Sequence, residues 1–477
     1  MNESMNQVRP EPTLMQRVRN IHLVGVGGSG MSGIAEVLAN LGFSVTGSDI
    51  NRGEVVARLE SLGVQVKIGH APENVERADV VVVSGAIGAD NPELIAARQA
   101  RTPVVSRAEM LGELMRFRHG IAVAGTHGKT TTTSLLASLL ADGKMDPTFI
   151  IGGLVNAFGS HARLGQGRYL VAEADESDGS FLLLQPVVSV VTNIDRDHLN
   201  AYDGSFDELQ KAFLEFLHHL PFYGLAVLCI DDPHVAELVP EVGRPVLTYG
   251  LDERADVHAR NVRQEGGQMH FELYLPDAKT GRPVTLNLPG IHNVQNALGA
   301  ATVAWELGVD VDTIARSLES FAGIGRRFSE LGRREIGGRS VRLVEDYGHH
   351  PTELDAVLSA ARAGWPASRL VVVFQPHRFS RTRDLFDAFV RVLSEPDVLV
   401  LMDIYPAGET PLVGIDSPAL ARAIVQKGGP APVLVSGVED VEAALSGLVE
   451  DDDLVLLMGA GDVGRLGGQL GNPEGAR

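Results

Sequence analysis

Residues 121–132 read IAVAGTHGKTTT, in which a short apolar run leads into a glycine-rich turn and then into a lysine and three threonines. The apolar part predicts a buried strand, and the stretch at about 131–140 predicts a helix. Such a turn between a strand and a helix binds phosphate, because its successive backbone amides surround the anion at the positive end of the helix. Lys129 would then reach the terminal phosphates, and the Thr130 hydroxyl would ligate Mg²⁺.

The turn departs from the usual phosphate-loop pattern, in which four residues separate the first glycine from the Gly-Lys pair. Here two residues stand between Gly125 and Gly128, and Val123 occupies the position of the first glycine. The strand, the glycines, the Lys-Thr pair and the helix still follow in the expected order, so we predict a shortened phosphate loop. The residues predicted to bind phosphate in it are Gly125, Thr126, His127, Gly128, Lys129, Thr130 and Thr131.

On both sides of this loop, short β-branched runs alternate with amphipathic stretches, which predicts an α/β protein of three domains. Expected strands of the first block are 21–26, 43–46 and 80–83, and more antiparallel alternation at 256–288 predicts a mixed sheet in the second. We expect a Rossmann-like N-terminal domain, an ATPase-like central domain and a Rossmann-like C-terminal domain. The predicted bounds are a loose tail at 1–18, domains at 19–118, 119–327 and 328–477, and a hinge at Gly323–Gly325.

The first block opens with GVGGSG at residues 25–30, directly after an expected strand. This GxGxxG spacing directs amides at a pyrophosphate, and Asp49, at the end of the second strand, is placed for a ribose contact. The pattern by itself favours an NAD-dependent dehydrogenase, but the amides suit any diphosphate-linked nucleotide. The residues predicted to bind this nucleotide are Gly27, Gly28, Ser29, Gly30, Met31, Asp49 and Ser84, the last of which follows the valine strand.

Two acidic segments, EADESD (173–178) and NIDRDH (193–198), each follow an apolar run of the second block. The carboxyl ends of parallel strands meet at one edge of a sheet, where this block also carries its phosphate loop. Carboxylate oxygens and imidazoles would supply the further ligands of a metal bound to a triphosphate. We therefore prefer metal chelation to the alternative of solvated surface charges or helix caps.

The composition excludes several classes of protein. The chain has 477 residues, with 41 Lys and Arg against 61 Asp and Glu, a net charge of −20. This balance argues against a protein that coats nucleic acid or an anionic membrane. A lone cysteine, Cys229, forms no internal disulfide, and no apolar run approaches the roughly 20 residues of a membrane span. With no signal-peptide core visible either, we expect a cytoplasmic protein without membrane insertion.

Four segments together resemble the Mur ligase family, ATP-dependent amide-forming enzymes of peptidoglycan precursor synthesis. They are GTHGKTTT (125–132), EADESD (173–178), TNIDRDHLN (192–200) and GIHNVQNALGA (290–300). Other segments resemble one member of that family, which joins L-alanine to the lactyl carboxylate of UDP-N-acetylmuramate through an acyl phosphate. They are HLVGVGGSGMSGIAEVL (22–38), DYGHHPTE (346–353), FQPHRFSRTRDLF (374–386) and DIYPAGE (403–409).

The resemblance implies roles for individual residues. Lys129 would bind the β and γ phosphates of ATP, and two Mg²⁺ ions, replaceable by Mn²⁺, would be held by Thr130 with Glu173 and by His198. Asn193 is a weaker metal candidate. The residues implied on the nucleotide are His292, Asn293, Asn296, Arg327 and Asp346, and those implied on the amino-acid side are Tyr347, His349, His350, His377, Arg378 and Arg381. The catalytic set would be Lys129, His198, Arg327 and His349.

Three alternatives remain open from the sequence. They are the NAD-dependent dehydrogenase, a non-enzymatic phosphate-loop switch, and a recycling ligase that attaches a tripeptide to UDP-N-acetylmuramate. We expect a monomer or weak dimer. Other members of the family carry a carbamylated lysine near the second metal, but the register of Lys211 does not fit that role, and we assign it none. Asn293 could also serve as a helix cap, and Arg381 as a solvated residue.

Overall fold

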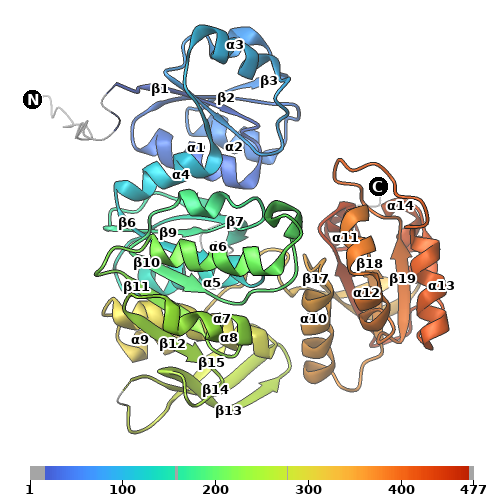
Figure 1. Ribbon diagram of the computed structural model, residues 1–477. Coiled ribbons are helices and arrows are strands. Elements are labelled where there is room, and N and C mark those ends of the chain that lie inside the picture. Colours follow the sequence, from blue (N-terminus) through green and yellow to red (C-terminus); the bar gives the residue numbers. More distant parts are fainter. Residues whose placement is uncertain (1–14, 16, 156–159, 277, 472–477) are drawn as a thin grey trace, which may run out of the picture. The chain divides into compact units, whose positions relative to one another are not determined.

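The computed structural model describes residue 15 and residues 17–155, 160–276 and 278–471 (Figure 1). Its strands form three sheets of 5, 10 and 6 strands, interleaved with helices, which confirms the predicted three-domain α/β class. The chain divides into two compact units. The first contains residues 1–259, 273–281 and 295–317, and the second contains residues 260–272, 282–294 and 318–477.

The N-terminal sheet has the order β3-β2-β1-β4-β5, with every strand pair parallel. Helix α3 covers one face of this sheet and α1 and α2 cover the other (Figure 1). The strand order reverses between β1 and β4, so their carboxyl ends flank the crevice where such sheets bind ligands. The elements are β1 Asn20–Val24, α1 Ser29–Asn40, β2 Ser44–Asp49, α2 Glu54–Ser61, β3 Gln65–Ile68, η1 Pro72–Val75, β4 Val80–Val83, α3 Pro92–Ala100, β5 Val104–Ser106 and α4 Arg107–Arg116.

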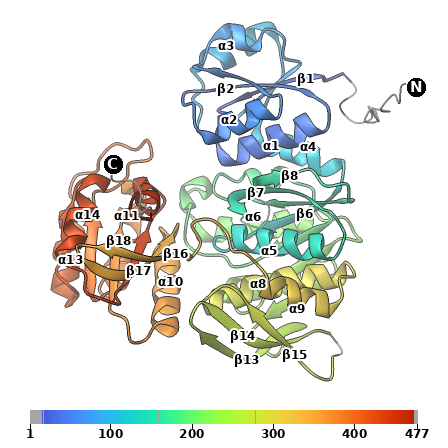
Figure 2. The same cartoon turned by 180° about the vertical axis from the view of Figure 1, so that it is seen from behind.

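The central sheet has the order β15-β14-β13-β12-β11-β10-β6-β9-β7-β8. Its parallel part is built on β6, which lies between β10 and β9. The predicted alternation at 256–288 corresponds to β13, β14 and β15, the first two joined by Gly266 and Gly267 as a hairpin (Figure 2). The strands are β6 His119–Ala124, β7 Thr148–Val155, β8 Ser160–Arg163, β9 Tyr169–Glu173, β10 Val188–Val191, β11 Leu225–Cys229, β12 Val246–Gly250, β13 Val257–Glu265, β14 Gln268–Tyr274 and β15 Arg282–Leu286. The helices are α5 Lys129–Asp142, η2 Ser180–Leu183, η3 Leu199–Tyr202, α6 Phe206–His218, α7 Pro233–Leu238, η4 Val239–Glu241, α8 Ile291–Glu306 and α9 Val311–Glu319.

The C-terminal sheet has the order β16-β17-β21-β18-β19-β20, in which β16 is antiparallel to β17 and the other pairs are parallel. The sequence reading missed β16, because its polar sequence SELGRREI carries no apolar run and a bulge interrupts its register between Glu330 and Gly332. The strands are β16 Ser329–Ile336, β17 Arg339–Asp346, β18 Leu370–Phe374, β19 Val398–Met402, β20 Val433–Val435 and β21 Leu454–Met458. The helices are α10 Pro351–Gly364, α11 Phe379–Asp384, α12 Phe386–Val392, α13 Ser417–Lys427, α14 Val438–Ser446, η5 Asp462–Arg465 and α15 Leu466–Gly471.

One hydrophobic core runs through the first and second sheets, which ties the two nucleotide-loop candidates to a common framework. Aromatic rings concentrate in its central part, where Phe181 meets Phe213 edge-on at 5.2 Å and stacks on Phe216 at 5.0 Å. Gly33 of α1 lets that helix approach the central sheet, since a Cβ there would lie 3.1 Å from the Ala162 side chain. Within the described residues, no helix is long and apolar enough to cross a membrane.

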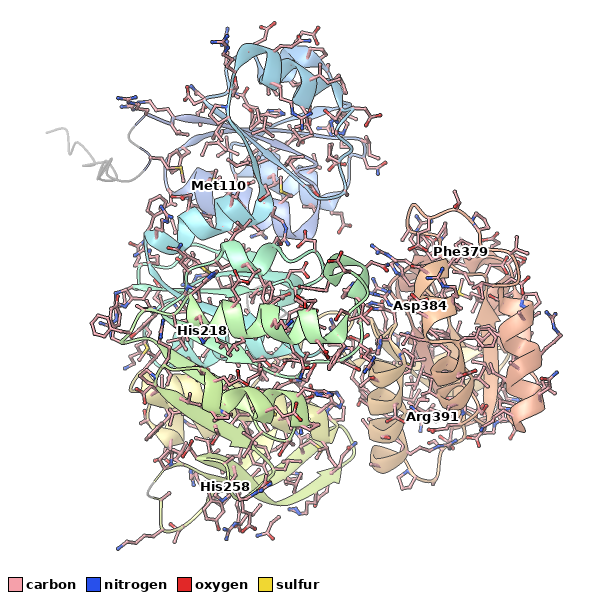
Figure 3. All side chains as sticks on the ribbon, in the orientation of Figure 1. Met110, His218, His258, Phe379, Asp384 and Arg391 are labelled. Atoms are coloured by element: carbon pink, nitrogen blue, oxygen red, sulfur yellow. The ribbon has the colours of Figure 1, made fainter. Side chains whose placement is uncertain are left out.

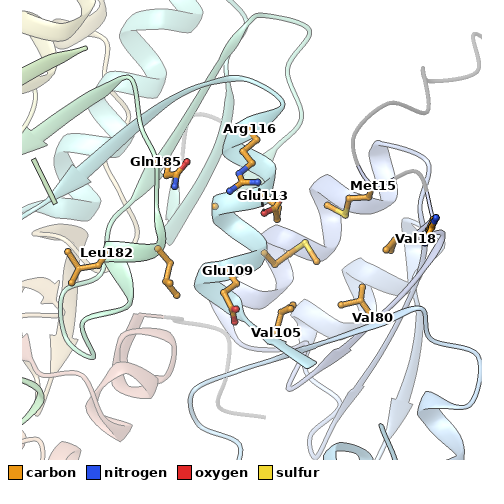
Figure 4. A pocket seen from close by; sticks show the side chains of 13 residues that line it. Met15, Val18, Val80, Val105, Glu109, Glu113, Arg116, Leu182 and Gln185 are labelled. Atoms are coloured by element: carbon orange, nitrogen blue, oxygen red, sulfur yellow. Dashed lines mark ion pairs between the residues drawn. The ribbon is translucent and has the colours of Figure 1, made fainter. Parts of the chain in front are cut away.

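A cavity of about 820 Å³ opens beside α4 (Figure 4). Its wall combines apolar side chains of the first sheet with the charged pair Glu113 and Arg116, whose charged groups lie 3.3 Å apart. No predicted site residue is among the described residues that line it. The lining residues are Met15, Arg17, Val18, Val80, Val105, Glu109, Met110, Gly112, Glu113, Arg116, Leu182, Leu183 and Gln185.

The packing of Phe181, Phe213 and Phe216 predicts how much stability is lost when one of these rings is removed. Replacing the fully buried Phe213 by alanine removes its contacts with Phe181 and leaves a cavity, so we expect the free energy of unfolding to fall by about 3–5 kcal/mol. Urea unfolding followed by circular dichroism measures the change. Phe222→Ala is the control, because that ring is 85% exposed and its loss should change stability little. Equal losses of stability in the two variants would contradict the placement of Phe213 in the buried core.

Candidate active site

The phosphate loop lies between β6 and α5, with α5 beginning at Lys129 as the Gly-Lys pattern predicts. Gly125 and Gly128 have φ angles of 129° and 82°, which are accessible to glycine and strained for other residues. A Cβ at Gly125 would also collide with the Thr192 hydroxyl. The two glycines are therefore required by the turn itself, before any ligand is considered.

The end of β10 braces the backbone of this loop. The Thr192 hydroxyl donates to the His127 carbonyl at 2.6 Å, and the Asp195 amide donates to the Thr126 hydroxyl at 2.8 Å. The side chain of Asn193 accepts from the His127 amide at 2.8 Å and donates to its carbonyl at 3.0 Å. Both polar atoms of the Asn193 side chain thus bind the loop, so Asn193 braces the loop, and its role as a weaker metal candidate stays a prediction.

Lys129 lies folded over its own loop. Its Nζ donates to the carbonyls of Gly125 at 2.7 Å and Thr126 at 3.1 Å, and forms an ion pair with Glu176 at 2.7 Å. Burial opposes the charged form of Lys129, but the neighbouring carboxylates of Glu176 and Asp175 hold its pKa above the ordinary value. The ammonium is therefore charged and positioned at the mouth of the anion cradle.

Glu176 is the buried partner of Lys129, and the sequence analysis did not single it out from its acidic segment. Its side chain is 1% exposed, and burial raises its pKa to about 7, aided by the negative Asp175 and opposed by Lys129. Tyr202 donates a hydrogen bond to its backbone carbonyl. The segment has four acidic residues among six, and its sequence does not show which of them is buried against Lys129. That depends on how the chain turns after β9.

The three predicted metal ligands occupy neighbouring parts of the same unit. Thr130 is the second residue of α5, and Glu173 ends β9, the strand next to β6. Glu173 is half-buried, and one of its oxygens accepts from the Gly152 amide at 2.9 Å. His198 precedes η3 in a left-handed conformation, with its ring 3.4 Å from Asp197. A hydroxyl, a carboxylate and a carboxylate-paired imidazole fit the ligand preferences of Mg²⁺ or Mn²⁺.

The predicted adenine-side motif is divided between the two units. Asn296 contacts the phosphate-loop helix, because its Oδ1 accepts from the Thr132 hydroxyl at 3.2 Å and a Cβ at Gly128 would collide with it. Asn293 does not cap α8, which already begins at Ile291; its amide donates to the Pro289 carbonyl at 2.7 Å. In the second unit, burial lowers the pKa of His292 to about 4, and the positive Arg327 contributes.

The GVGGSG segment forms the turn between β1 and α1. The Ser48 carbonyl accepts from the amides of Gly25 at 2.9 Å and Val26 at 3.0 Å, and a carboxylate oxygen of Asp49 accepts from the Gly27 amide at 2.9 Å. Asp49 therefore fixes the loop as well as lying where a ribose contact is predicted. Gly28 ends this turn as the residue before α1, with its N–H bonded to the Gly25 carbonyl at 3.2 Å.

Two predicted residues in this turn have limited roles. Met31 is 1% exposed, so its side chain belongs to the core and only its backbone amide is available to a ligand. The side chain of Ser29 lies outside the described part of the chain. Ser84 lines a cavity of about 230 Å³ at the carboxyl end of β4, as its position after the valine strand predicts.

Arg107 lines the same cavity, although no motif in the sequence points to this residue. Its guanidinium lies 3.5 Å from the carboxylate of Asp175, and a Cβ at Gly30 would come within 2.9 Å of its Nη1. The absence of a side chain at Gly30 thus admits a cation to the start of α1. Arg107 is the first residue of α4, where an arginine is unremarkable in sequence, and only the fold brings it to the GxGxxG turn.

The second unit brings most of the predicted amino-acid-side residues together. Arg327 lies over the ring of Tyr347 at 5.3 Å, which contacts His349 edge-on at 5.4 Å. The His349 ring is 5.6 Å from that of His377, and Arg381 approaches His377 Nδ1 at 3.4 Å. Burial lowers the pKa of His377 to about 3, together with the positive charges of its neighbours, so this imidazole is neutral.

Other predicted residues of that unit have structural contacts. Arg381 is 7% exposed, so the alternative that Arg381 is a solvated surface residue is wrong. Arg378, just before α11, is exposed. Figure 3 labels Phe379 and Asp384, the first and last residues of α11. His350 is buried and caps α10 by accepting from the Thr352 amide at 3.3 Å. The buried carboxylate of Asp346 accepts from the amides of Phe328 and Gly348 at 2.7 and 2.6 Å, and burial raises its pKa.

Lys211 lies on α6 with its side chain 70% exposed and its ammonium 2.7 Å from Glu208. This is a surface ion pair between residues three apart on one helix, of a kind worth little to stability.

Three family models match the chain in series. They describe a Mur ligase catalytic domain (residues 20–119), a Mur ligase middle domain (123–304) and a Mur ligase glutamate ligase domain (326–461). The chain belongs to the Mur ligase family. This membership sets aside the dehydrogenase that the GxGxxG turn favoured by itself.

Full-length relatives agree with the family. A UDP-N-acetylmuramate–L-alanine ligase of Halorhodospira halophila is 60% identical over 455 residues, covering 95% of this chain and 93% of the relative. The enzyme of the same name from Xanthomonas campestris pv. campestris is 58% identical, covering 96% of each chain. Among solved structures, UDP-N-acetylmuramate–alanine ligase MurC from Thermotoga maritima matches with a TM-score of 0.79 and 28% identity, covering 94% of this chain and 98% of that one. A murein peptide ligase from Psychrobacter arcticus matches with a TM-score of 0.70 and 26% identity, covering 95% and 99%.

The crowding at Gly125 predicts a loss of nucleotide binding on substitution. In Gly125→Ala the new methyl group displaces Thr192 and strains the turn, so affinity for a fluorescent ATP analogue should fall by at least about tenfold. Gly53→Ala is the control, because no atom lies within 4 Å of a Cβ there and its φ is −100°. Unchanged affinity in a folded Gly125→Ala protein would show that the loop does not hold the nucleotide.

Proposed function

We propose that this protein uses ATP to join L-alanine to the lactyl carboxylate of UDP-N-acetylmuramate, a step in peptidoglycan precursor synthesis. The observation that carries the proposal is the 60% identity, over nearly the whole chain, to a ligase of that name. Two murein peptide ligases among the solved structures are 26% and 30% identical, well below that 60%, so the alanine ligase is favoured over the tripeptide-attaching alternative. We place the reaction in the cytoplasm, where ATP and nucleotide-linked sugars are made.

The chemistry requires activation of a carboxylate, because direct amide formation would need oxide as the leaving group. The lactyl carboxylate attacks the γ-phosphorus of ATP, the bond to the β–γ bridging oxygen breaks, and an acyl phosphate and ADP form. The α-amine of L-alanine then attacks the acyl carbon, loses a proton, and phosphate leaves. As in other phosphoryl transfers, the protein contributes mainly alignment and charge neutralisation.

The phosphate loop aligns the triphosphate in this scheme. Its amides are fixed by Thr192 and Asn193, and Lys129 is already charged beside them. Reaching the β and γ phosphates requires Lys129 to exchange its bonds to the loop carbonyls for phosphate oxygens. The braced loop amides, by contrast, would favour the transition state because they need no reorganisation when charge develops.

Thr130, Glu173 and His198 would hold two divalent cations, with Mg²⁺ as the expected ion and Mn²⁺ as a substitute. Bound there, the ions would neutralise charge on the phosphates as two anions approach each other. The protein groups beside these ligands remain fixed by their own contacts, such as that of Glu173 with the Gly152 amide at 2.9 Å. Asp197, 3.4 Å from the His198 ring, orients that imidazole.

The sugar nucleotide is assigned to the GVGGSG turn, with its diphosphate at the start of α1 and with Asp49, Ser84 and Arg107 nearby. Alanine is assigned to the second unit, where the row from Arg327 through His349 to Arg381 supplies positive charge for its carboxylate. The neutral His377 in that row adds a polar group without a second charge. We expect a monomer or weak dimer.

Replacing Lys129 tests whether its ammonium takes part in catalysis. In Lys129→Ala, a preorganised donor to the phosphates is lost, so kcat for ATP-dependent ligation should fall by about 10² or more. ATP hydrolysis is measured with and without UDP-N-acetylmuramate and L-alanine. Lys211→Ala, which breaks only a surface ion pair, should keep full activity. Turnover of ATP that does not depend on either co-substrate would instead support the phosphate-loop switch.

Amino-acid selectivity tests the choice of family member. Mass spectrometry of reactions offered L-alanine, glycine, L-serine and a tripeptide should show L-alanine joined fastest, with slower joining of glycine and serine. One methylene group in a small pocket discriminates by only about 1–3 kcal/mol, so some leakage to these analogues is expected. A product formed from the tripeptide alone would overturn the proposed function in favour of the recycling ligase.

A further inference from the structure

A buried polar cluster lies under the carboxyl end of the first sheet, on the face covered by α3. Its centre is the carboxylate of Glu93, in the first turn of α3 and 0% exposed. One carboxylate oxygen accepts from the Ser48 hydroxyl at 2.6 Å and lies 3.1 Å from Nδ1 of His70. The other accepts from the Asn74 amide at 2.5 Å and lies 3.8 Å from Nε2 of His22. Burying a carboxylate is costly, and these hydrogen bonds offset part of that cost.

The hydrogen bonds of the cluster determine the tautomer of His70. A carboxylate only accepts, and the Ser48 hydroxyl already donates its proton to Glu93. The Nδ1 atom of His70, which is 3.1 Å from Glu93 and 3.0 Å from the Ser48 oxygen, must therefore carry the ring proton. In the neutral ring, Nε2 then presents a lone pair and acts as an acceptor. His70 is 14% exposed on its side chain, so this edge of the ring is the part left for a ligand.

His70 is tied to the nucleotide-binding turn through the backbone. The Ser48 carbonyl holds the Gly25 and Val26 amides, and the Asp49 carbonyl accepts from the Gly69 amide at 2.8 Å. Two large apolar side chains are exposed at the same strand ends: Ile50 is 69% exposed and Ile68, paired in register with Asp49, is 50% exposed. Exposed aliphatic groups beside a ribose-binding carboxylate are suited to the faces of a planar base.

We propose that His70, held by Glu93 and Ser48, selects uracil in the sugar nucleotide by accepting a hydrogen bond from the imide N3–H. This inference rests on the proposed function for the class of ligand and goes beyond it in naming the residue that reads the base. Cytosine presents a lone pair at N3, which would face the lone pair of Nε2. A base methylated at N3 has no proton to donate. His70 is thus the specificity residue, and Glu93 is a positioning residue that acts through it.

The charge of Glu93 is maintained by the same contacts. Burial raises the cost of ionisation, but the nearby His22 ring and the hydrogen bonds from Ser48 and Asn74 outweigh it and lower the pKa of Glu93 to about 2. The carboxylate therefore remains an acceptor throughout the neutral range, which keeps the proton of His70 on Nδ1. An amide at position 93 would offer both donor and acceptor and would not fix the tautomer.

The wild-type protein provides the first test. Isothermal titration calorimetry compares UDP-N-acetylmuramate with the corresponding cytidine and N3-methyluridine compounds. We expect both analogues to bind at least about tenfold more weakly, because each leaves the Nε2 acceptor without a donor. Equal affinity for the N3-methyl compound would overturn the inference without any variant.

Variants locate the selectivity in the cluster. His70→Ala should weaken binding of the uridine compound and leave the cytidine compound little changed, so that their affinity ratio approaches one. Glu93→Gln should lower the same ratio by at least about threefold, since His70 would then populate both tautomers. Glu36→Gln is the matched control: Glu36 is also buried in this domain, but its partner is Arg58, 3.1 Å away, and the ratio should remain that of wild type.

The outcomes separate the two proposals. If wild type ligates L-alanine to UDP-N-acetylmuramate but His70→Ala keeps the wild-type affinity ratio, the base-selection inference is wrong and the proposed function stands. If wild type binds none of the three nucleotides, the proposed function fails first. Should Glu93→Gln unfold in thermal melting, the His70→Ala ratio and the N3-methyl comparison still decide the inference.

Discussion

The rest of the candidate site depends on the hydrogen bonds between the phosphate loop and the two residues that follow β10, Thr192 and Asn193. Thr192 and Asn193 bind both the amide and the carbonyl of His127, so the loop amides are oriented before a nucleotide arrives. Because β10 pairs with β6, the strand that leads into the loop, these hydrogen bonds are a direct result of sheet order. A loop shortened by two residues has fewer amides to offer, and this external bracing compensates by holding those that remain.

Sheet order also explains how an acidic chain presents a cation at each of its two glycine turns. The net charge of −20 is a property of the whole chain, whereas a cation acts at the point where it is held. Lys129 pairs with Glu176 at the phosphate loop, and Arg107 pairs with Asp175 beside the GVGGSG turn. Both carboxylates come from the loop after β9, so one acidic segment positions both cations. The Lys129–Glu176 pair is the more buried of the two, and a buried ion pair contributes little net stability, so we interpret its role as placement.

The sequence predicted those parts of the molecule that depend on local pattern. Apolar runs located the parallel strands, and the glycine patterns located both strand-to-helix turns, because turn geometry restricts which residues are allowed. Parts that depend on tertiary approach were not predictable: Arg107 and Glu176 look like ordinary surface charges in sequence. The hydrogen bonds of the Asn193 side chain to the loop were likewise not predictable, because they depend on the approach of the segment after β10 to His127. Strand β16 was missed because an edge strand of polar residues lacks the apolar signal.

The two glycine turns of the first unit differ in the groups that hold their amides. In the first, the carboxylate of Asp49 accepts from the Gly27 amide, and the partly exposed Arg107 lies beside Gly30. In the second, the side chain and the backbone of Asn193 accept from the amides of His127 and Thr126, and Lys129 lies against the loop carbonyls. A carboxylate at a turn repels an anion, and the repulsion grows with the charge of that anion. The first turn is therefore better suited to a diphosphate than to a triphosphate, which supports the proposal that the sugar nucleotide binds at the first turn and ATP at the second.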